Sequence, residues 1–93
     1  MIKIKSIVRT CSACPSQWDM WDKDGNYYYV RYRHNSLTVE MGTSGGVILV
    51  DKNVSYGGGG YMTLEDLRKE LDYLFDMPLK EGHIVYQEPP NDK

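Results

Sequence analysis

Three short segments between residues 17 and 41 alternate apolar and polar side chains, and this alternation constrains the fold more than any other feature of the chain. The apolar positions are Trp18, Met20, Tyr28, Val30, Tyr32, Leu37, Val39 and Met41. A period of two residues is typical of a strand that buries one face. The segments 17–22, 27–33 and 37–41 therefore predict three neighbouring strands of an antiparallel β-meander.

The turn between the first two of these strands sets their register. Residues 23–25 suit a three-residue loop that is closed by Gly25 in the left-handed conformation, and this loop places Trp18 opposite Val30. A two-residue turn at the same place would slip the first strand by one residue. Trp21 would then join the core instead of Trp18. We expect the three-residue loop.

The second turn gives an independent check on the same face. A two-residue turn at His34 and Asn35 places Tyr32 opposite Leu37, and the pairing continues along both strands. Both turns therefore place the apolar side chains of all three strands on one side of the sheet.

The first nine residues also alternate and predict a further strand. One side of it carries Ile2, Ile4 and Val8, and the other side carries Lys3, Lys5 and Arg9. Only Ile7 breaks this alternation. Segments 47–50 and 83–87 predict two more short strands, whereas 51–62 has no periodicity and predicts a loop.

One helix is expected after this loop. Thr63 reads as its N-cap, with Asp66 three residues later as a weak capping-box partner. The apolar residues recur at helical spacing and are Leu64, Leu67, Leu71, Leu74 and Phe75. The helix is expected to end at Met77, because a residue before a proline avoids the helical conformation.

These elements predict an α+β fold in which one amphipathic helix packs on an antiparallel β-meander sheet. We expect a single domain over residues 1–88 and a disordered tail over 89–93. The chain has 93 residues, a net charge of −2 and a pI near 5.6, which disfavours non-specific nucleic-acid binding. Its longest aliphatic run, 47–50, is far too short for a membrane span, and its N-terminal residues do not resemble a signal peptide. A cytoplasmic protein is expected.

Cys11 and Cys14 form a C-x-x-C pair, but the chain offers no matching pair of histidines. His34 and His83 are too far apart in sequence for a zinc finger. We therefore expect two free thiols, no metal and no cofactor, and a zinc-stabilised interaction module remains an alternative. No combination of residues resembles a catalytic set, so no catalytic residue and no enzymatic activity are expected.

Four consecutive glycines occupy residues 57–60, just before the expected helix. They lack the Gly-Lys-Ser/Thr ending of a phosphate loop. The tract is expected to be a mobile loop that lets Tyr56 and Tyr61 adapt to a partner, or merely a linker.

The outward side of the meander provides the main candidate site for a partner. Its expected residues are Trp21, Tyr27, Tyr29, Arg31 and Arg33, joined by Tyr56 and Tyr61 from the glycine loop. Tyrosine, tryptophan and arginine are enriched in binding hot spots. Two other interpretations stay open: the arginines could pair with Asp19 and Glu40, or the N-terminal strand or the helix could cover this face.

Two runs carry a resemblance to a known group of proteins. They are Ala13-Cys14-Pro15-Ser16-Gln17-Trp18 and, after a glycine-containing turn, Tyr29-Val30-Arg31-Tyr32-Arg33. Over 13–40, about a third of the chain, the sequence resembles small uncharacterised bacteriophage proteins. The resemblance implies a phage or prophage origin, and small acidic phage proteins of this size are often inhibitors of host defence, including anti-CRISPR proteins.

We therefore expect a non-enzymatic binding module that docks on a host protein, in the host cytoplasm if it is phage-encoded. The alternative is a sponge for a small nucleotide signal, in which aromatic rings stack the base and arginine holds the phosphate. Exposed strand edges make a homodimer a further expectation.

Overall fold

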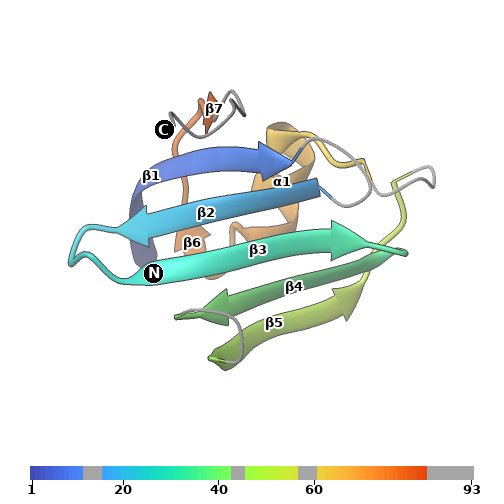
Figure 1. Cartoon of the computed structure of the whole chain (residues 1–93), viewed down its shortest axis with the longest axis horizontal. Helices are drawn as coiled ribbons and strands as arrows, with labels where there is room; N and C mark the ends of the chain where they lie inside the picture. The colour runs from blue at the N-terminus through green and yellow to red at the C-terminus, as the bar shows by residue number, and fades with distance from the viewer. Residues whose placement is uncertain (12–15, 43–45, 57–60, 84–93) are drawn as a thin grey trace, which may run out of the picture.

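The described molecule consists mainly of one β-sheet, with one short helix behind it (Figure 1). The computed structural model describes residues 1–11, 16–42, 46–56 and 61–83. In chain order the elements are β1 (Ile2–Cys11), β2 (Ser16–Asp22), β3 (Tyr27–Arg33), β4 (Ser36–Met41), β5 (Val47–Asn53), α1 (Leu64–Leu71), β6 (Phe75–Asp76) and β7 (Gly82–His83). The strand order is β5-β4-β3-β2-β1-β6, and β7 also pairs with β1.

The antiparallel meander from β2 to β4 has the predicted register. Trp18 lies opposite Val30 across β2 and β3. Gly25 has a φ of +88° and donates its N–H to the carbonyl of Asp22 at 3.1 Å, so the turn is the three-residue loop closed by a left-handed glycine. The alternative, with Trp21 in the core, is therefore wrong.

The turn between β3 and β4 is also confirmed. His34 and Asn35 both have positive φ, 52° and 61°, as a two-residue turn of type I′ requires. Tyr32 pairs with Leu37. The expected inner residues Trp18, Met20, Tyr28, Val30, Tyr32, Leu37 and Val39 are all at most 2% exposed, whereas Met41, which was expected on the same face, is 36% exposed.

β1 departs from the simple alternation that its sequence suggested. Its pairing with β2 shifts between Ile4 and Ser6, so that β1 carries one extra residue there. This β-bulge reverses which residues face inward. Ile7 is therefore buried, and Arg9, which was expected on the outer side, is buried as well at 4% exposure.

The helix is shorter than predicted. Thr63 caps it as expected, because its Oγ1 accepts the N–H of Asp66 at 3.0 Å. It ends at Leu71, so the expected helical positions Leu74 and Phe75 lie outside it. Phe75 instead belongs to β6, where it is 1% exposed and its backbone pairs in parallel with β1.

The helix ends early because the segment that follows it pairs with β1 near the N-terminus. The N–H of Ile2 donates to the carbonyl of Leu74 at 2.9 Å, and the ring of Phe75 meets that of Tyr28 edge-on at 5.3 Å. Pairing with the free edge of β1 gives hydrogen-bond partners to backbone N–H and C=O groups that a longer helix would have paired internally. Two helix leucines, Leu67 and Leu71, are fully buried in the core.

The remaining strands also differ from their predicted bounds. β5 continues to Asn53, so the expected loop at 51–62 begins later than predicted. The last described strand is β7, and the rest of the expected strand 83–87 and the expected tail 89–93 lie beyond the described residues. The glycines at 57–60 are also outside them.

Candidate functional site

The face of the sheet that points away from α1 carries five of the predicted site residues. In Figure 1, α1 lies behind the sheet, and no described helix covers the near face. Trp21 on β2 and Tyr27, Tyr29 and Arg31 on β3 are half-buried, while Arg33 at the end of β3 is exposed. These five residues are called the outer face below. The interpretation that the N-terminal strand or the helix covers them does not hold within the described residues, because β1 lies beside β2 in the sheet.

Three rings on the outer face are held by local contacts. The rings of Trp21 and Tyr27 pack at 5.6 Å with a tilt of 49°. The Tyr27 hydroxyl donates to the carboxylate of Asp19, and burial together with this hydrogen bond raises the pKa of Tyr27 well above its usual range. Gln17 donates its Nε2–H to the Tyr29 hydroxyl at 2.8 Å. The rings therefore present a pre-ordered surface.

The two arginines of the outer face have no acidic partner among the described residues. Among the residues that the structure describes, neither Arg31 nor Arg33 forms an ion pair. The Nε of Arg31 is buried and finds no hydrogen-bond acceptor. Asp19, one of the two expected partners, accepts from Tyr27 instead. The predicted cross-strand pairing of these arginines is therefore absent from the described structure.

A shallow hollow of about 300 Å³ lies beside these arginines. Its described lining consists of Arg31, Arg33, His34, Ser36 and Thr38. Sequence reasoning had not included His34 and Ser36 in the site, although the predicted turn already placed them next to Arg33. Two arginines line this hollow, and its other lining residues have polar groups, so its chemistry suits an anionic group.

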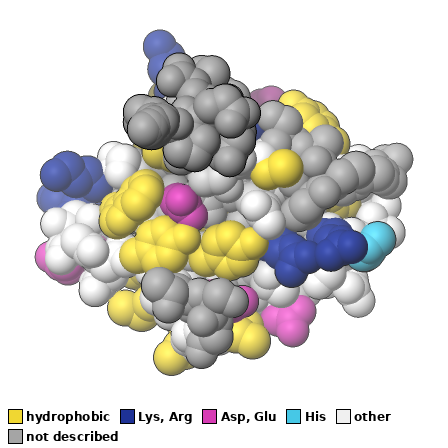
Figure 2. Space-filling model, in the orientation of Figure 1, with side chains coloured by type: hydrophobic (Ala, Val, Ile, Leu, Met, Phe, Trp, Pro, Cys, Tyr) yellow, Lys and Arg dark blue, Asp and Glu magenta, His cyan; other side chains and the backbone are white. Residues whose placement is uncertain are grey.

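The space-filling view shows how these side chains gather. In Figure 2, hydrophobic side chains cluster over the middle of the near face, with lysine or arginine side chains directly beside them. Hydrophobic and basic side chains are therefore continuous on this visible surface.

Tyr56 and Tyr61, the other two predicted site residues, lie on the opposite side of the sheet. The Tyr56 ring meets the ring of buried Tyr32 edge-on at 6.3 Å, and its hydroxyl donates to Glu70 on α1. Tyr61 is 49% exposed, and its ring lies 5.5 Å from the guanidinium of buried Arg9. The structure therefore does not bring these two tyrosines together with the outer face.

The expected thiols can be described only in part. Cys11 is half-buried and not in a disulfide, and Cys14 lies outside the described residues. Across the described part of the chain, no group of three or more His, Cys, Asp or Glu side chains could hold a metal ion.

Within the described ranges, no helix is long and apolar enough to cross a membrane.

Comparison with known proteins adds no assignment. No protein-family model matches the sequence, and no curated protein and no solved structure match it.

Proposed function

We propose that this protein is a non-enzymatic binding module whose outer face docks on an acidic surface of another protein. The observation that carries the proposal is that Arg31 and Arg33 form no ion pair with any described residue and lie beside three ordered aromatic rings. Rings of this kind supply contact area at a low cost in conformational entropy, and arginine adds directional hydrogen bonds.

Charge favours an acidic partner. An arginine without a counter-ion gains more from an incoming carboxylate than one that must first break an internal ion pair. The guanidinium can bind a carboxylate through two parallel hydrogen bonds. The whole chain carries a net charge of −2, so the basic hollow beside Arg33 is a local exception. This contrast would orient the protein as it approaches an acidic surface.

The resemblance to small bacteriophage proteins suggests the class of partner. We propose a bacterial defence protein that this chain inhibits by occupying an acidic functional surface. Inhibition by docking needs no catalytic group, in agreement with a site built from rings and guanidinium groups.

The test is capture of the partner by immobilised protein from a bacterial host lysate, followed by reconstitution with the purified partner. Arg31→Ala/Arg33→Ala should weaken the reconstituted complex at least tenfold, because two charge-assisted contacts are lost together. Raising the salt concentration should slow association of the wild type, since screening reduces the attraction between exposed charges.

The matched control is Lys69→Ala/Lys80→Ala, which removes the same charge at two exposed positions away from the outer face. It should bind like the wild type. If both double variants weakened the complex equally, the effect would come from net charge alone, and the docking site would be overturned. Unchanged binding of the arginine variant, with an unchanged melting temperature, would also overturn it.

A small nucleotide is the second candidate for the outer face. The hollow of about 300 Å³ is at the lower limit of small-ligand sites, and Arg31 and Arg33 could hold a phosphate there. However, His34 carries the only ring among the described residues that line it, so stacking of a base on a tyrosine or tryptophan ring would require Tyr29 or Trp21 to move.

Native mass spectrometry of the purified protein with cyclic dinucleotides separates the two candidates. Retained dinucleotide, lost in Arg31→Ala/Arg33→Ala, would support the small-ligand function. A bare chain mass and no thermal shift would exclude it and leave docking on a protein.

A further inference from the structure

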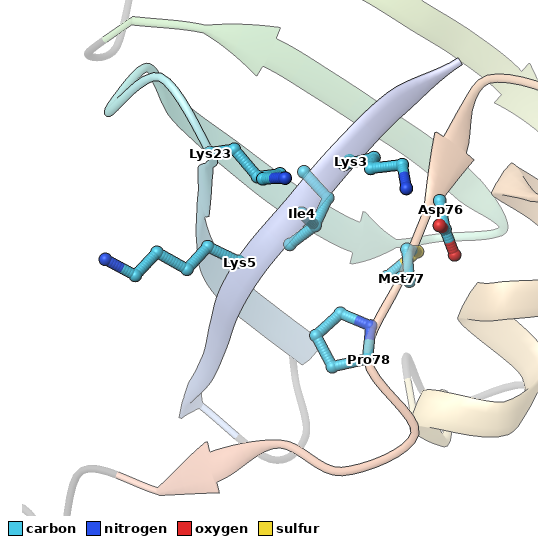
Figure 3. A pocket seen from close by; sticks show the side chains of 7 residues that line it. All are labelled: Lys3, Ile4, Lys5, Lys23, Asp76, Met77 and Pro78. Carbon is cyan, nitrogen blue, oxygen red and sulfur yellow. The ribbon is translucent and has the colours of Figure 1, made fainter.

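A second hollow, of about 530 Å³, lies at the far edge of β1, away from the outer face (Figure 3). On this edge β1 pairs with β6 at Ile2 and Lys3, and next with β7 at Val8. No described strand pairs with the edge between these two points, because the chain after β6 loops outward. The hollow lies at the beginning of this gap.

Its apolar part comes from two segments that are far apart in sequence. Ile4 of β1 and Met77 after β6 line it, at 7% and 8% exposure, and Pro78 adds a half-buried ring. Figure 3 shows Ile4 on one side and Met77 with Pro78 on the other. These side chains offer a hydrophobic surface to a ligand that enters the hollow.

Three lysines surround this apolar part, and one carboxylate accompanies them. Lys3 and Lys5 come from β1, Lys23 comes from the turn after β2, and the acid is Asp76. In Figure 3, Lys3 and Lys23 lie at the same end of the hollow, while Lys5 extends away from the others. The hollow thus has a basic end, in a chain whose net charge is −2.

These lysines are not neutralised by the described part of the protein. None of the three forms an ion pair there, not even with Asp76. A neighbouring hollow shares Lys3 and Lys23 and is also lined by Asp22 and Asp24. The Asp22 carboxylate, however, already accepts hydrogen bonds from the backbone N–H groups of Asp24 and Asn26 and from two side chains.

We propose that this hollow binds a small phosphate monoester that carries an aromatic or other apolar group. Lys3 and Lys23 hold the phosphate, and the apolar group packs on Ile4, Met77 and Pro78. Lysine binds phosphate as a mobile point charge, so the two ammonium groups can adjust to a dianion. The volume falls in the usual range for small-ligand sites. This site is independent of the proposed docking surface.

The test is a titration with phenyl phosphate, followed by two-dimensional amide NMR and by calorimetry. Saturable shifts should appear at the amides of residues 3–5, 23 and 76–77. Inorganic phosphate and benzyl alcohol, which supply only one half of the ligand each, should bind at least tenfold more weakly. Higher salt should weaken the binding of phenyl phosphate, because the contact is electrostatic at an open site.

Lys3→Gln/Lys23→Gln should weaken phenyl phosphate binding at least tenfold. Both lysines are exposed, so the variant is expected to fold, and its amide spectrum checks this directly. The matched control, Lys69→Gln/Lys80→Gln, removes the same charge at exposed positions outside the hollow and should bind normally.

Three results would overturn the site. They are the absence of saturable shifts, equal binding of inorganic phosphate and phenyl phosphate, and unchanged binding in the folded Lys3→Gln/Lys23→Gln variant. Equal weakening in the control variant would likewise show only a general charge effect.

Discussion

The guanidinium of Arg9 and the carboxylate of Glu81 form an ion pair in which Nε and Oε2 are 2.8 Å apart, at 4% and 15% side-chain exposure. Arg9 also donates to the carbonyl of Met62 at 2.8 Å and lies over the Trp18 ring at 4.4 Å. The same carboxylate accepts the indole N–H of Trp18 at 2.7 Å. One acidic side chain therefore ties β1 and β2 to the segment before β7.

Replacing this carboxylate should be costly. Glu81→Ala removes the carboxylate that pairs with the buried guanidinium of Arg9, and we expect the free energy of unfolding to fall by about 3 kcal/mol. Urea denaturation measures the change. Glu65→Ala, at an exposed helix position, should cost less than about 1 kcal/mol. In an Arg9→Met background, Glu81→Ala should cost much less; an equal cost in both backgrounds would refute the coupling.

The acid stability of the protein should depend on Asp22. The hydroxyl of Tyr28 and the donors of Asn26 and Asp24 hold the pKa of this carboxyl at about 2, below its ordinary value of 3.8. A depressed pKa in the folded state stabilises the protein above the unfolded pKa. This stabilisation is therefore present above about pH 4 and is lost as the pH falls toward 2.

Tyr28→Phe tests this assignment, because the Tyr28 hydroxyl makes the largest contribution to the shift. The carboxyl pKa of Asp22, followed by NMR, should rise toward 3.8 in the variant. The loss of the urea midpoint between pH 4 and pH 2 should become smaller. An unchanged Asp22 titration would show that the backbone donors alone are sufficient.

Tyr56 should give the protein a matching sensitivity to alkali. Its hydrogen bond to Glu70, together with burial, raises the pKa of Tyr56 from 10 to about 12. A raised pKa stabilises the folded state below the unfolded pKa, so this stabilisation is lost as the pH rises from 10 to 12. Tyr56→Phe should lose about 1 kcal/mol at neutral pH and show a smaller alkaline loss in urea denaturation. Identical alkaline curves for the two proteins would contradict this.

The loop between β2 and β3 requires its glycine. Gly25 has a φ of +88° with open space around the position of a Cβ atom, so Gly25→Ala would introduce backbone strain without a clash. We expect a loss of about 1 kcal/mol, measured by thermal or urea unfolding. Gly82→Ala is the control, because Gly82 has no positive φ and a Cβ there makes an ordinary contact of 3.5 Å with Val8. Similar losses in both variants would argue against the conformational explanation.

Local rules were sufficient for the meander. The alternation of side chains and two short turns predicted that Trp18 faces Val30 and that Tyr32 faces Leu37, and both pairs are observed. Side-chain direction in a strand has a period of two, and a turn of known length fixes the register between its flanking strands. The placement of Tyr27, Tyr29, Arg31 and Arg33 on the side opposite the core follows from the same geometry.

Long-range contacts decided the features that were predicted wrongly. The bulge in β1 buries Arg9, and its counter-ion, Glu81, lies 72 residues away in the chain. The helix ends at Leu71 because Phe75 pairs with β1 instead, near the other end of the sequence. The larger hollow at the edge of β1 likewise brings together Lys3, Lys23 and Pro78 from distant parts of the sequence.

The sequence by itself thus determined which side chains of β2, β3 and β4 lie inside and which lie outside, except for the exposed Met41 at the end of β4, because that information is contained in neighbouring residues. Only the tertiary structure decided the strand order, the burial of Arg9 and the separation of Tyr56 and Tyr61 from the outer face. These features depend on which distant segment satisfies the free edge of β1 and the charge of Arg9, and no local periodicity encodes that choice.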